Sequence, residues 1–267
     1  MQEIISTNNT KVKFIVQLQK KSSLRHQLQE FVIEGLRELE AALKNNFKVK
    51  TIYFYPELVN ESILLDWIDK YHSDFEIVKI SKDVFKKLSY RNSTEGVIAV
   101  VNMKLHKIED LKLTANPLLL VAESIEKPGN MGAMLRSIDG AGADAFVWVN
   151  AKVDIYNPNV IRASLGMVFS KQIALASLEE LSNYLQKHSI KLYAATLQNA
   201  NVYYRENFTT PSAIAVGAED KGLTNGFRDL MHQAIYIPMK GQADSLNVSV
   251  SAAVLLYEAV RQRNINN

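Results

Sequence analysis

Residues 117–150 read PLLLVAESIEKPGNMGAMLRSIDGAGADAFVWVN, and their pattern indicates the fold. Two apolar runs, PLLLVAES (117–124) and DAFVWVN (144–150), are typical of strands buried on both faces of a sheet. A helical stretch lies between them, near 130–142. Three more apolar runs of the same kind follow, at KLYAATL (191–197), SAIAVGAE (212–219) and AIYIPMK (234–240).

Helical stretches also lie between and after these later runs. They are near 158–169, 178–188, 225–232 and 248–263. Strands that alternate with helices favour a parallel sheet, because a helix can return the chain to the start of the next strand. The sequence therefore predicts an α/β fold with a parallel, doubly wound sheet over residues 117–267.

The residues before 106 indicate a second, smaller α/β unit. Apolar residues at helical spacing predict an amphipathic helix from Ser22 to about Asn45. Further elements are expected in this order: a strand at 49–55, a helix at 62–72, a strand at 75–80, a helix from Ser81 to Leu88 with Ser81 as its N-cap, and a strand at 95–103. The expected domains are 1–105 and 117–267, joined by a linker at 106–116.

Composition excludes several classes of protein. With 47% hydrophobic and 22% charged residues, a chain of 267 residues is an ordinary globular protein. The absence of cysteine excludes disulfides, thiolate zinc sites and cysteine nucleophiles. The five histidines are scattered, so no metal site is expected. Without a signal peptide or an apolar run long enough to span a bilayer, we expect a cytoplasmic protein that does not enter membranes.

The formal charge of +3 comes from an excess of basic residues in the N-terminal part. Over the first 29 residues, only Glu3 opposes five cations, which are Lys11, Lys13, Lys20, Lys21 and Arg25. Such a segment can contact phosphates, although ordinary solvated surface gives the same pattern.

Three loops that follow predicted strands carry unusual polar residues. Ligands of open α/β sheets bind at this edge. The first loop carries Asn130 and Arg136, the second places Glu219 after Gly217, and the third holds Ser245 and Asn247. Helix caps and a tight turn would also account for these residues.

Two common nucleotide-binding patterns do not apply. Gly140, Gly142 and Ala145 match G-x-G-x-x-A, but they close a predicted helix instead of following a strand and opening one. No P-loop motif is present. The G-x-S-x-G motif, the usual signal of hydrolases with a serine nucleophile, is also absent.

Together the three loops resemble the motifs of the SpoU/TrmH family of RNA ribose 2′-O-methyltransferases, which belong to the SPOUT class. The matching segments, in the family's order, are NMGAMLR (130–136), GAEDKGL (217–223), and IPMKG (237–241) followed by SLN (245–247). The resemblance covers about residues 117–263. Asp220 and residues 170–172 depart from the family's usual pattern.

Residues 1–105 are similar to the family's small substrate-binding domain, which has a ribosomal-protein-like RNA-binding fold. The similarity lies in FVIEG (31–35), Leu88-Ser89 and Glu95-Gly96-Val97.

The resemblance implies a C-terminal SPOUT-type sheet with a deep trefoil knot, S-adenosylmethionine as cofactor, and a homodimer. An apolar last helix would suit either a dimer interface or the core. The implied cofactor-binding residues are Thr196, Gly217, Ile237, Gly241 and Leu246. The implied catalytic residues are Arg136, Asn130, Glu219, Ser245 and Asn247. Arginine stays protonated in proteins, so we expect Arg136 to hold a phosphate or a developing alkoxide, with Glu219 as the rival base.

The function expected from this resemblance is methylation of a ribose 2′-hydroxyl in RNA. The added N-terminal domain favours ribosomal RNA, in particular 23S rRNA, over transfer RNA. A tRNA ribose methyltransferase and a catalytically inactive RNA-binding relative remain alternatives. A dehydrogenase-like enzyme is disfavoured by the misplaced glycines.

Overall fold

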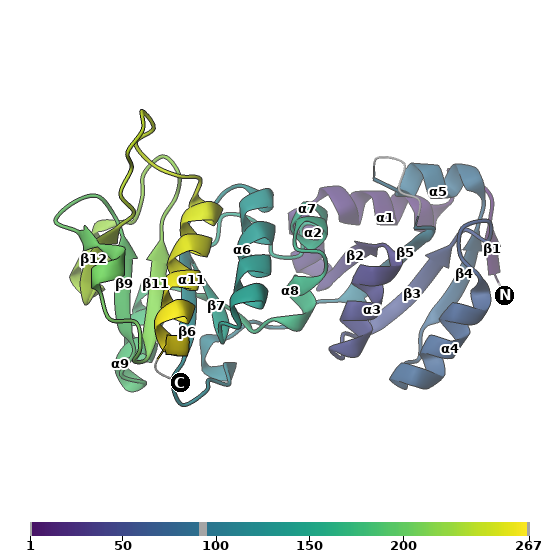
Figure 1. Cartoon of the computed structure of the whole chain (residues 1–267). Helices are drawn as coiled ribbons and strands as arrows, with labels where there is room; N and C mark the ends of the chain where they lie inside the picture. The colour runs from purple at the N-terminus through teal and green to yellow at the C-terminus, as the bar shows by residue number, and fades with distance from the viewer. Residues whose placement is uncertain (1, 91–94, 266–267) are drawn as a thin grey trace. The chain divides into compact units, whose positions relative to one another are not determined.

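The computed structural model describes residues 2–90 and 95–265 and divides into two compact units (Figure 1). The N-terminal unit consists of residues 1–105 and 154–170, and the C-terminal unit of residues 106–153 and 171–267. This division differs from the expected domains mainly at 154–170, which pack with the N-terminal residues. The expected ranges stay a prediction of which stretches bind RNA and cofactor.

The C-terminal unit is built on one parallel sheet. Over its described residues the sheet has seven strands, in the order β10-β12-β9-β11-β6-β7-β8. The predicted apolar runs form β6 (Leu118–Glu123), β7 (Ala145–Val149), β9 (Lys191–Ala195), β11 (Ser212–Val216) and β12 (Gln233–Tyr236). Two strands at the sheet's edges, β8 (Ile173–Ala176) and β10 (Asn201–Val202), lie outside the predicted runs. The predicted parallel α/β fold is confirmed.

Helices cover both faces of this sheet. On one side α6 (Pro128–Ala141) and α11 (Val248–Ile265) pack on each other, and α11 also contacts β6 and β11 (Figure 1). Leu119 and Val121 share a core with α9 (Leu178–Lys187) and α10 (Asn225–Leu230). Leu120 lies between these two residues, and it is also fully buried because alternate residues of a strand face opposite sides. This burial explains the continuous apolar runs.

The glycines near residue 140 end a helix. Helix α6 stops at Ala141, and Gly142 follows with a φ of 64°, the left-handed conformation common at helix C-termini. The chain then enters β7, so the structural context of a dinucleotide-binding fingerprint is absent here.

The trefoil knot stays a prediction. In the described part of the chain, no helix is both long enough and apolar enough to cross a bilayer.

The N-terminal unit has a smaller mixed sheet. Its described strands lie in the order β1-β4-β3-β5-β2, in which β5 pairs antiparallel with β2 and β3. The strands are β1 (Gln2–Ile4), β2 (Glu30–Glu34), β3 (Val49–Phe54), β4 (Glu76–Ile80) and β5 (Val97–Asn102). The helices are α1 (Thr10–Lys20), α2 (Ser22–Leu28), α3 (Leu36–Lys44), α4 (Glu61–Tyr71), α5 (Lys82–Leu88), α7 (Pro158–Ala163) and α8 (Met167–Ser170). Ser81 caps α5 by accepting a bond from the Val84 N–H, as predicted.

The single helix predicted from Ser22 to about Asn45 is wrong. The segment forms α2, β2 and α3. Gln29 ends α2 with a φ of 54°, and Gly35 has a φ of 106°, so neither position continues a right-handed helix. Between them, Phe31 and Val32 pair with β5. The apolar spacing suited a helix, but burial in the sheet outweighed that local preference.

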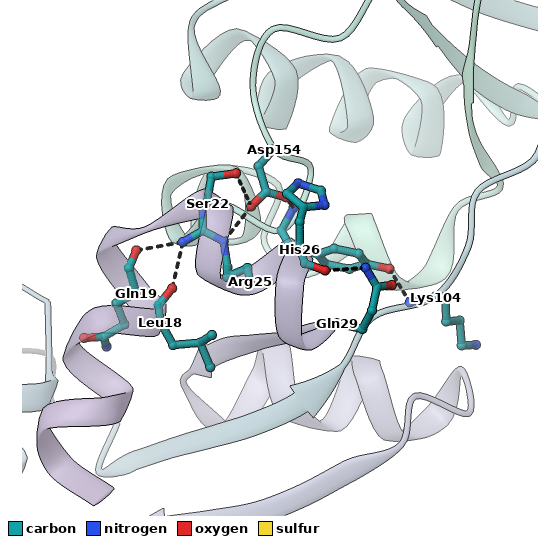
Figure 2. A network of polar contacts seen from close by, with 9 residues as sticks. Leu18, Gln19, Ser22, Arg25, His26, Gln29, Lys104 and Asp154 are labelled. Carbon is teal, nitrogen blue, oxygen red and sulfur yellow. Dashed lines mark hydrogen bonds and ion pairs between the residues drawn. The ribbon is translucent and has the colours of Figure 1, made fainter. Parts of the chain in front are cut away.

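Residues 154–170 are held in the N-terminal unit by a buried ion pair (Figure 2). The Arg25 Nε donates to Asp154 Oδ2 at 2.5 Å, and the two side chains are 2% and 3% exposed. Arg25 also donates through Nη1 to the Leu18 and Gln19 carbonyls. The expectation that the basic segment is solvated or contacts phosphates is therefore wrong for Arg25. Lys11, at the other end of that segment, pairs with Glu76 at 3.2 Å.

Candidate active site

Residues from all three motif loops meet at one edge of the larger sheet. Asn130 lies in the first turn of α6, Glu219 in the turn after β11, and Asn247 directly before α11. Because β6 and β11 are neighbouring parallel strands, their carboxyl ends bring the first two loops together. The third loop joins β12 to α11 and projects from the same side of the sheet (Figure 1).

Asn130, Glu219 and Asn247 form a hydrogen-bonded cluster, which we call the motif cluster. The Asn130 amide donates to Glu219 Oε1 at 2.6 Å. The Asn247 amide donates to Asn130 Oδ1 at 3.2 Å and to Glu219 Oε1 at 3.3 Å. Ser249, in the first turn of α11, donates through its hydroxyl to Asn247 Oδ1 at 2.6 Å, so the orientation of this amide is fixed. The capping interpretation of Asn130 is wrong, since Lys127 occupies the N-cap position.

Lys127 is a member of this site that sequence reasoning missed. Its ammonium forms an ion pair with Glu219 Oε2. This contact, helped by the Asn130 hydrogen bond, lowers the pKa of Glu219 below its ordinary value, although partial desolvation opposes the shift. A cation at the start of a helix is electrostatically unfavourable, which is the signal that could have drawn attention to Lys127. A carboxylate held in this way is a weak base.

Arg136 lies farther along α6 and is exposed. Within the described residues it makes no hydrogen bond and no ion pair. Its guanidinium is thus available to an external anion, and its planar fork suits a phosphate or another oxyanion.

A pocket of about 130 Å³ lies beside the third loop. Three of the predicted cofactor-binding residues, Thr196, Ile237 and Leu246, line it. Ser245 lines it as well, and makes no described hydrogen bond to the motif cluster. The walls are mostly apolar, with the Thr196 and Ser245 hydroxyls and the Asp244 carboxylate among the polar groups.

The other two predicted cofactor-binding residues, Gly217 and Gly241, are not among the residues that line this pocket. A side chain on Gly217 would begin 2.1 Å from the Gly222 carbonyl carbon and 2.3 Å from the Leu223 nitrogen. Glycine is therefore required here because the second loop folds back on itself. At Gly241 a side chain would meet no described atom within 4 Å.

Glu123 anchors the second loop and was also missed by sequence reasoning. It ends β6, is 1% exposed, and accepts bonds from the backbone N–H and the hydroxyl of Thr224, both at 2.8 Å. The Asn150 amide donates to the same carboxylate at 3.4 Å. A carboxylate at the end of a buried apolar strand is a recognisable signal, because burial of an ionised group requires partners.

Among the described residues, no group of three His, Cys, Asp or Glu side chains could hold a metal ion.

Comparison with known proteins agrees with this geometry. Residues 117–257 match the SpoU rRNA Methylase family, and residues 9–99 match the MRM3-like substrate binding domain. A 23S rRNA (guanosine(2553)-2′-O)-methyltransferase of Bacillus subtilis is 32% identical over 96% of this chain and 98% of its own length. A 23S rRNA (uridine(2479)-2′-O)-methyltransferase of Streptomyces viridochromogenes is 27% identical over 88% of this chain and 83% of its own.

Two solved structures are similar over nearly the whole chain. The crystal structure of an RNA 2′-O ribose methyltransferase has a TM-score of 0.82 and 39% identity, and covers 98% of this chain and 100% of its own. The SpoU methyltransferase AviRb from Streptomyces viridochromogenes, in complex with AdoMet, has a TM-score of 0.87 and 26% identity, with coverages of 96% and 99%. These comparisons confirm the resemblance inferred from the three motifs, and the chain belongs to the SpoU rRNA methylase family.

Proposed function

We propose that this protein transfers a methyl group from S-adenosylmethionine to a ribose 2′-hydroxyl of 23S ribosomal RNA. The observation that carries the proposal is the motif cluster, which joins three loops distant in sequence, together with the exposed Arg136 on the same helix as Asn130. Both curated relatives named above act on 23S rRNA at a 2′-oxygen.

The pocket at Thr196, Ile237 and Leu246 fits part of this cofactor. Apolar walls suit an adenine ring, and Asp244 offers a negative charge to the cofactor's positive groups. The volume is below the roughly 300–1,000 Å³ typical of sites that enclose a whole ligand. We therefore expect the remainder of the cofactor to lie against the open loops that carry Gly217 and Gly241. The bound cofactor supplies a methyl group on a cationic sulfur, which an oxygen nucleophile can displace.

In this scheme Arg136 binds the substrate. Its guanidinium holds a phosphate of the target nucleotide or stabilises the developing alkoxide, and it does not act as a base, because it stays protonated. The motif cluster, with Lys127, orients the ribose. Glu219 stays ionised and holds the two amides and the ammonium, and its lowered pKa makes it a poor acceptor for the hydroxyl proton. The hydroxyl proton therefore passes to water or to a substrate phosphate as the methyl group leaves the sulfur.

The N-terminal unit would select the RNA, as its match to a substrate-binding domain suggests. We also propose a homodimer. Helix α11 buries Leu255 and Leu256 within its own unit but leaves Val250 47% and Tyr257 51% exposed, so it has apolar surface for a second copy. Light scattering coupled to gel filtration tests this proposal, and a monomer at micromolar concentration would contradict it.

The activity is tested with RNA from cells that lack the gene. Purified protein and methyl-labelled S-adenosylmethionine should introduce a single 2′-O-methyl group into 23S rRNA, mapped by primer extension. An Arg136→Ala variant that still binds cofactor is the matched control. Label in tRNA alone would change the substrate to tRNA. RNA binding without label would instead support an inactive RNA-binding relative.

A further inference from the structure

The N-terminal unit contains a second and larger cavity, of about 890 Å³, which the proposed methyl transfer does not use. Its walls come from α1, β2 and α3, from residues 87–90 at the end of α5 together with Glu95, and from residues 157–162 at α7. These walls belong to one compact unit, although 157–162 lie within the range matched by the methylase family. The volume is typical of a small-molecule site and is sufficient for a nucleotide.

One wall carries a stacked pair of planar side chains. The guanidinium carbon of Arg162 lies 4.2 Å from the centre of the Tyr90 ring. Its Nη2 donates to Asn159 Oδ1 at 2.8 Å, and the Asn159 N–H is in turn bound by the Asn157 side chain that caps α7. The guanidinium plane is thus fixed on the cavity wall. Unpaired nucleobases stack on such planes and on aromatic rings.

A buried carboxyl group lines the same cavity. Glu38 is only 6% exposed, and within the described chain it makes no hydrogen bond or ion pair with another residue. A side chain on Gly35 would begin 2.6 Å from Glu38 Oε2 and 2.4 Å from Glu95 Oε2, so both carboxylate oxygens lie against this glycine, where a side chain would displace them. Burial, and the charge of Glu95, raise the pKa of Glu38. Its own backbone N–H donates to this carboxyl group, which leaves acceptor capacity that a ligand's N–H groups can use.

The cavity also has a cationic component. Lys20 ends α1, lines the cavity, and is exposed without an ion pair in the described residues. Together with Arg162 it offers positive charge beside a carboxyl group and a stacking surface. Glu34 and Glu95 line the cavity as well, but Glu34 accepts the Tyr90 N–H and Glu95 accepts the Leu36 N–H. Phosphate, planar ring and N–H donors occur together in nucleotides.

We propose that this cavity binds one unpaired guanine nucleotide of the RNA substrate, an inference that rests on the proposed function. Guanine carries N1–H and N2–H side by side on its Watson–Crick edge, and one carboxylate can accept both. Adenine, cytosine and uracil offer no such pair of adjacent donors on that edge. Glu38 would read the base, Arg162 would stack on it, and Lys20 would contact the phosphate.

The test is calorimetric titration of the full chain, with S-adenosylmethionine at saturation and a chelator present. The probes are GMP, IMP and AMP, and the trinucleotides ApGpA and ApIpA, in which I lacks the 2-amino group. GMP should bind at least about tenfold more tightly than AMP or IMP. Tenfold is the lower end of the discrimination between bases that one bidentate contact provides. ApGpA should bind more tightly than GMP if the natural ligand is RNA.

Three variants assign the contacts. Glu38→Gln keeps the size of the side chain and should lower GMP affinity at least about tenfold, because the amide NH2 of glutamine would face an N–H group of guanine, and both are donors. Arg162→Ala should lower the affinities for GMP and for AMP alike, by roughly fivefold or more, because both bases lose the stacking contact. Asp66→Asn, on an exposed face of α4 outside the cavity, is the matched control and should change nothing.

Equal binding of GMP and AMP, or unchanged GMP affinity in Glu38→Gln with S-adenosylmethionine binding intact, would overturn the proposal. Binding of GMP with no gain for ApGpA would assign the cavity to a free nucleotide and not to RNA. Methylation of 23S rRNA by the wild type is measured in parallel. Glu38-dependent GMP binding without any methylation would refute the proposed function alone, whereas methylation without guanine selectivity would refute this inference alone.

Discussion

Replacing Arg25 by alanine should destabilise the N-terminal unit more than most single substitutions would. Its side chain is 2% exposed and that of Asp154 is 3% exposed, so neither charge can be solvated in the folded unit. After the change, the polar partners that Asp154 retains among the described residues are the Ser22 hydroxyl, the Tyr156 N–H and a distant His26 (Figure 2). The Leu18 and Gln19 carbonyls also lose their donor.

Removal of one partner from a buried ion pair typically costs about 3–5 kcal/mol. For a unit of this size such a loss corresponds to a fall of about 10–20 °C in melting temperature. Differential scanning calorimetry with S-adenosylmethionine present should show the transition of the N-terminal unit moving down, while the transition of the cofactor-binding unit stays in place. Arg25→Lys should recover little of the lost stability, because one ammonium cannot reach the Asp154 carboxylate and both backbone carbonyls as the planar guanidinium does.

A double-mutant cycle separates the ion pair from other effects. Asp154→Ala alone should cost a similar amount, because it leaves the Arg25 guanidinium buried without its counter-charge. The double variant should be more stable than the sum of the single losses predicts, by about 1–3 kcal/mol. A fall of less than about 2 °C for Arg25→Ala, or strict additivity in the cycle, would refute the assignment of a buried, coupled pair.

Substitutions at four other positions test the sites. Arg136→Ala should reduce methyl transfer about 100- to 1000-fold while cofactor affinity, measured by titration, is unchanged, and Arg136→Lys should be nearly as inactive because it lacks the fork; a loss below tenfold would show that Arg136 is not essential. Gly217→Val should lower the melting temperature of the C-terminal unit, because the side chain meets loop backbone, whereas Gly241→Val should weaken only cofactor binding. Glu38→Gln should raise the free energy of unfolding at neutral pH, since burial raises the pKa of Glu38 and the ionised form opposes folding. The gain should disappear as the pH falls below the unfolded-state pKa, and a loss of stability would contradict it.

The larger sheet was predictable because its strands are buried on both faces, which leaves continuous apolar runs such as PLLLVAES. The helix predicted through Phe31 was wrong because three consecutive apolar residues satisfy either period, and only pairing with β5 decides between them. Arg25 was grouped with solvated cations because no local pattern reveals a partner 129 residues away.

The motif cluster shows a similar limit. Asn130, Glu219 and Asn247 were selected from their loops and from the family resemblance, but the contacts among them follow from tertiary structure alone, since Asn130 and Glu219 are 89 residues apart. Lys127 and Glu123 have no motif of their own. Their roles become clear only through the groups they touch, a carboxylate for Lys127 and the Thr224 hydroxyl and N–H for Glu123.

Residues 154–170 explain why domains drawn along the sequence and units in space differ in this protein. The rings of Tyr156 and Phe31 are stacked, with their centres 4.2 Å apart. The centre of the Phe169 ring lies 5.9 Å from that of Phe31 and 5.1 Å from that of Phe47. These aromatic contacts and the Arg25 ion pair give the segment both apolar and polar attachment to the N-terminal unit. The same segment carries Arg162. A unit that receives one wall of its cavity from within the methylase sequence cannot form that cavity from residues 1–105 alone, so the proposed guanine recognition requires the full chain.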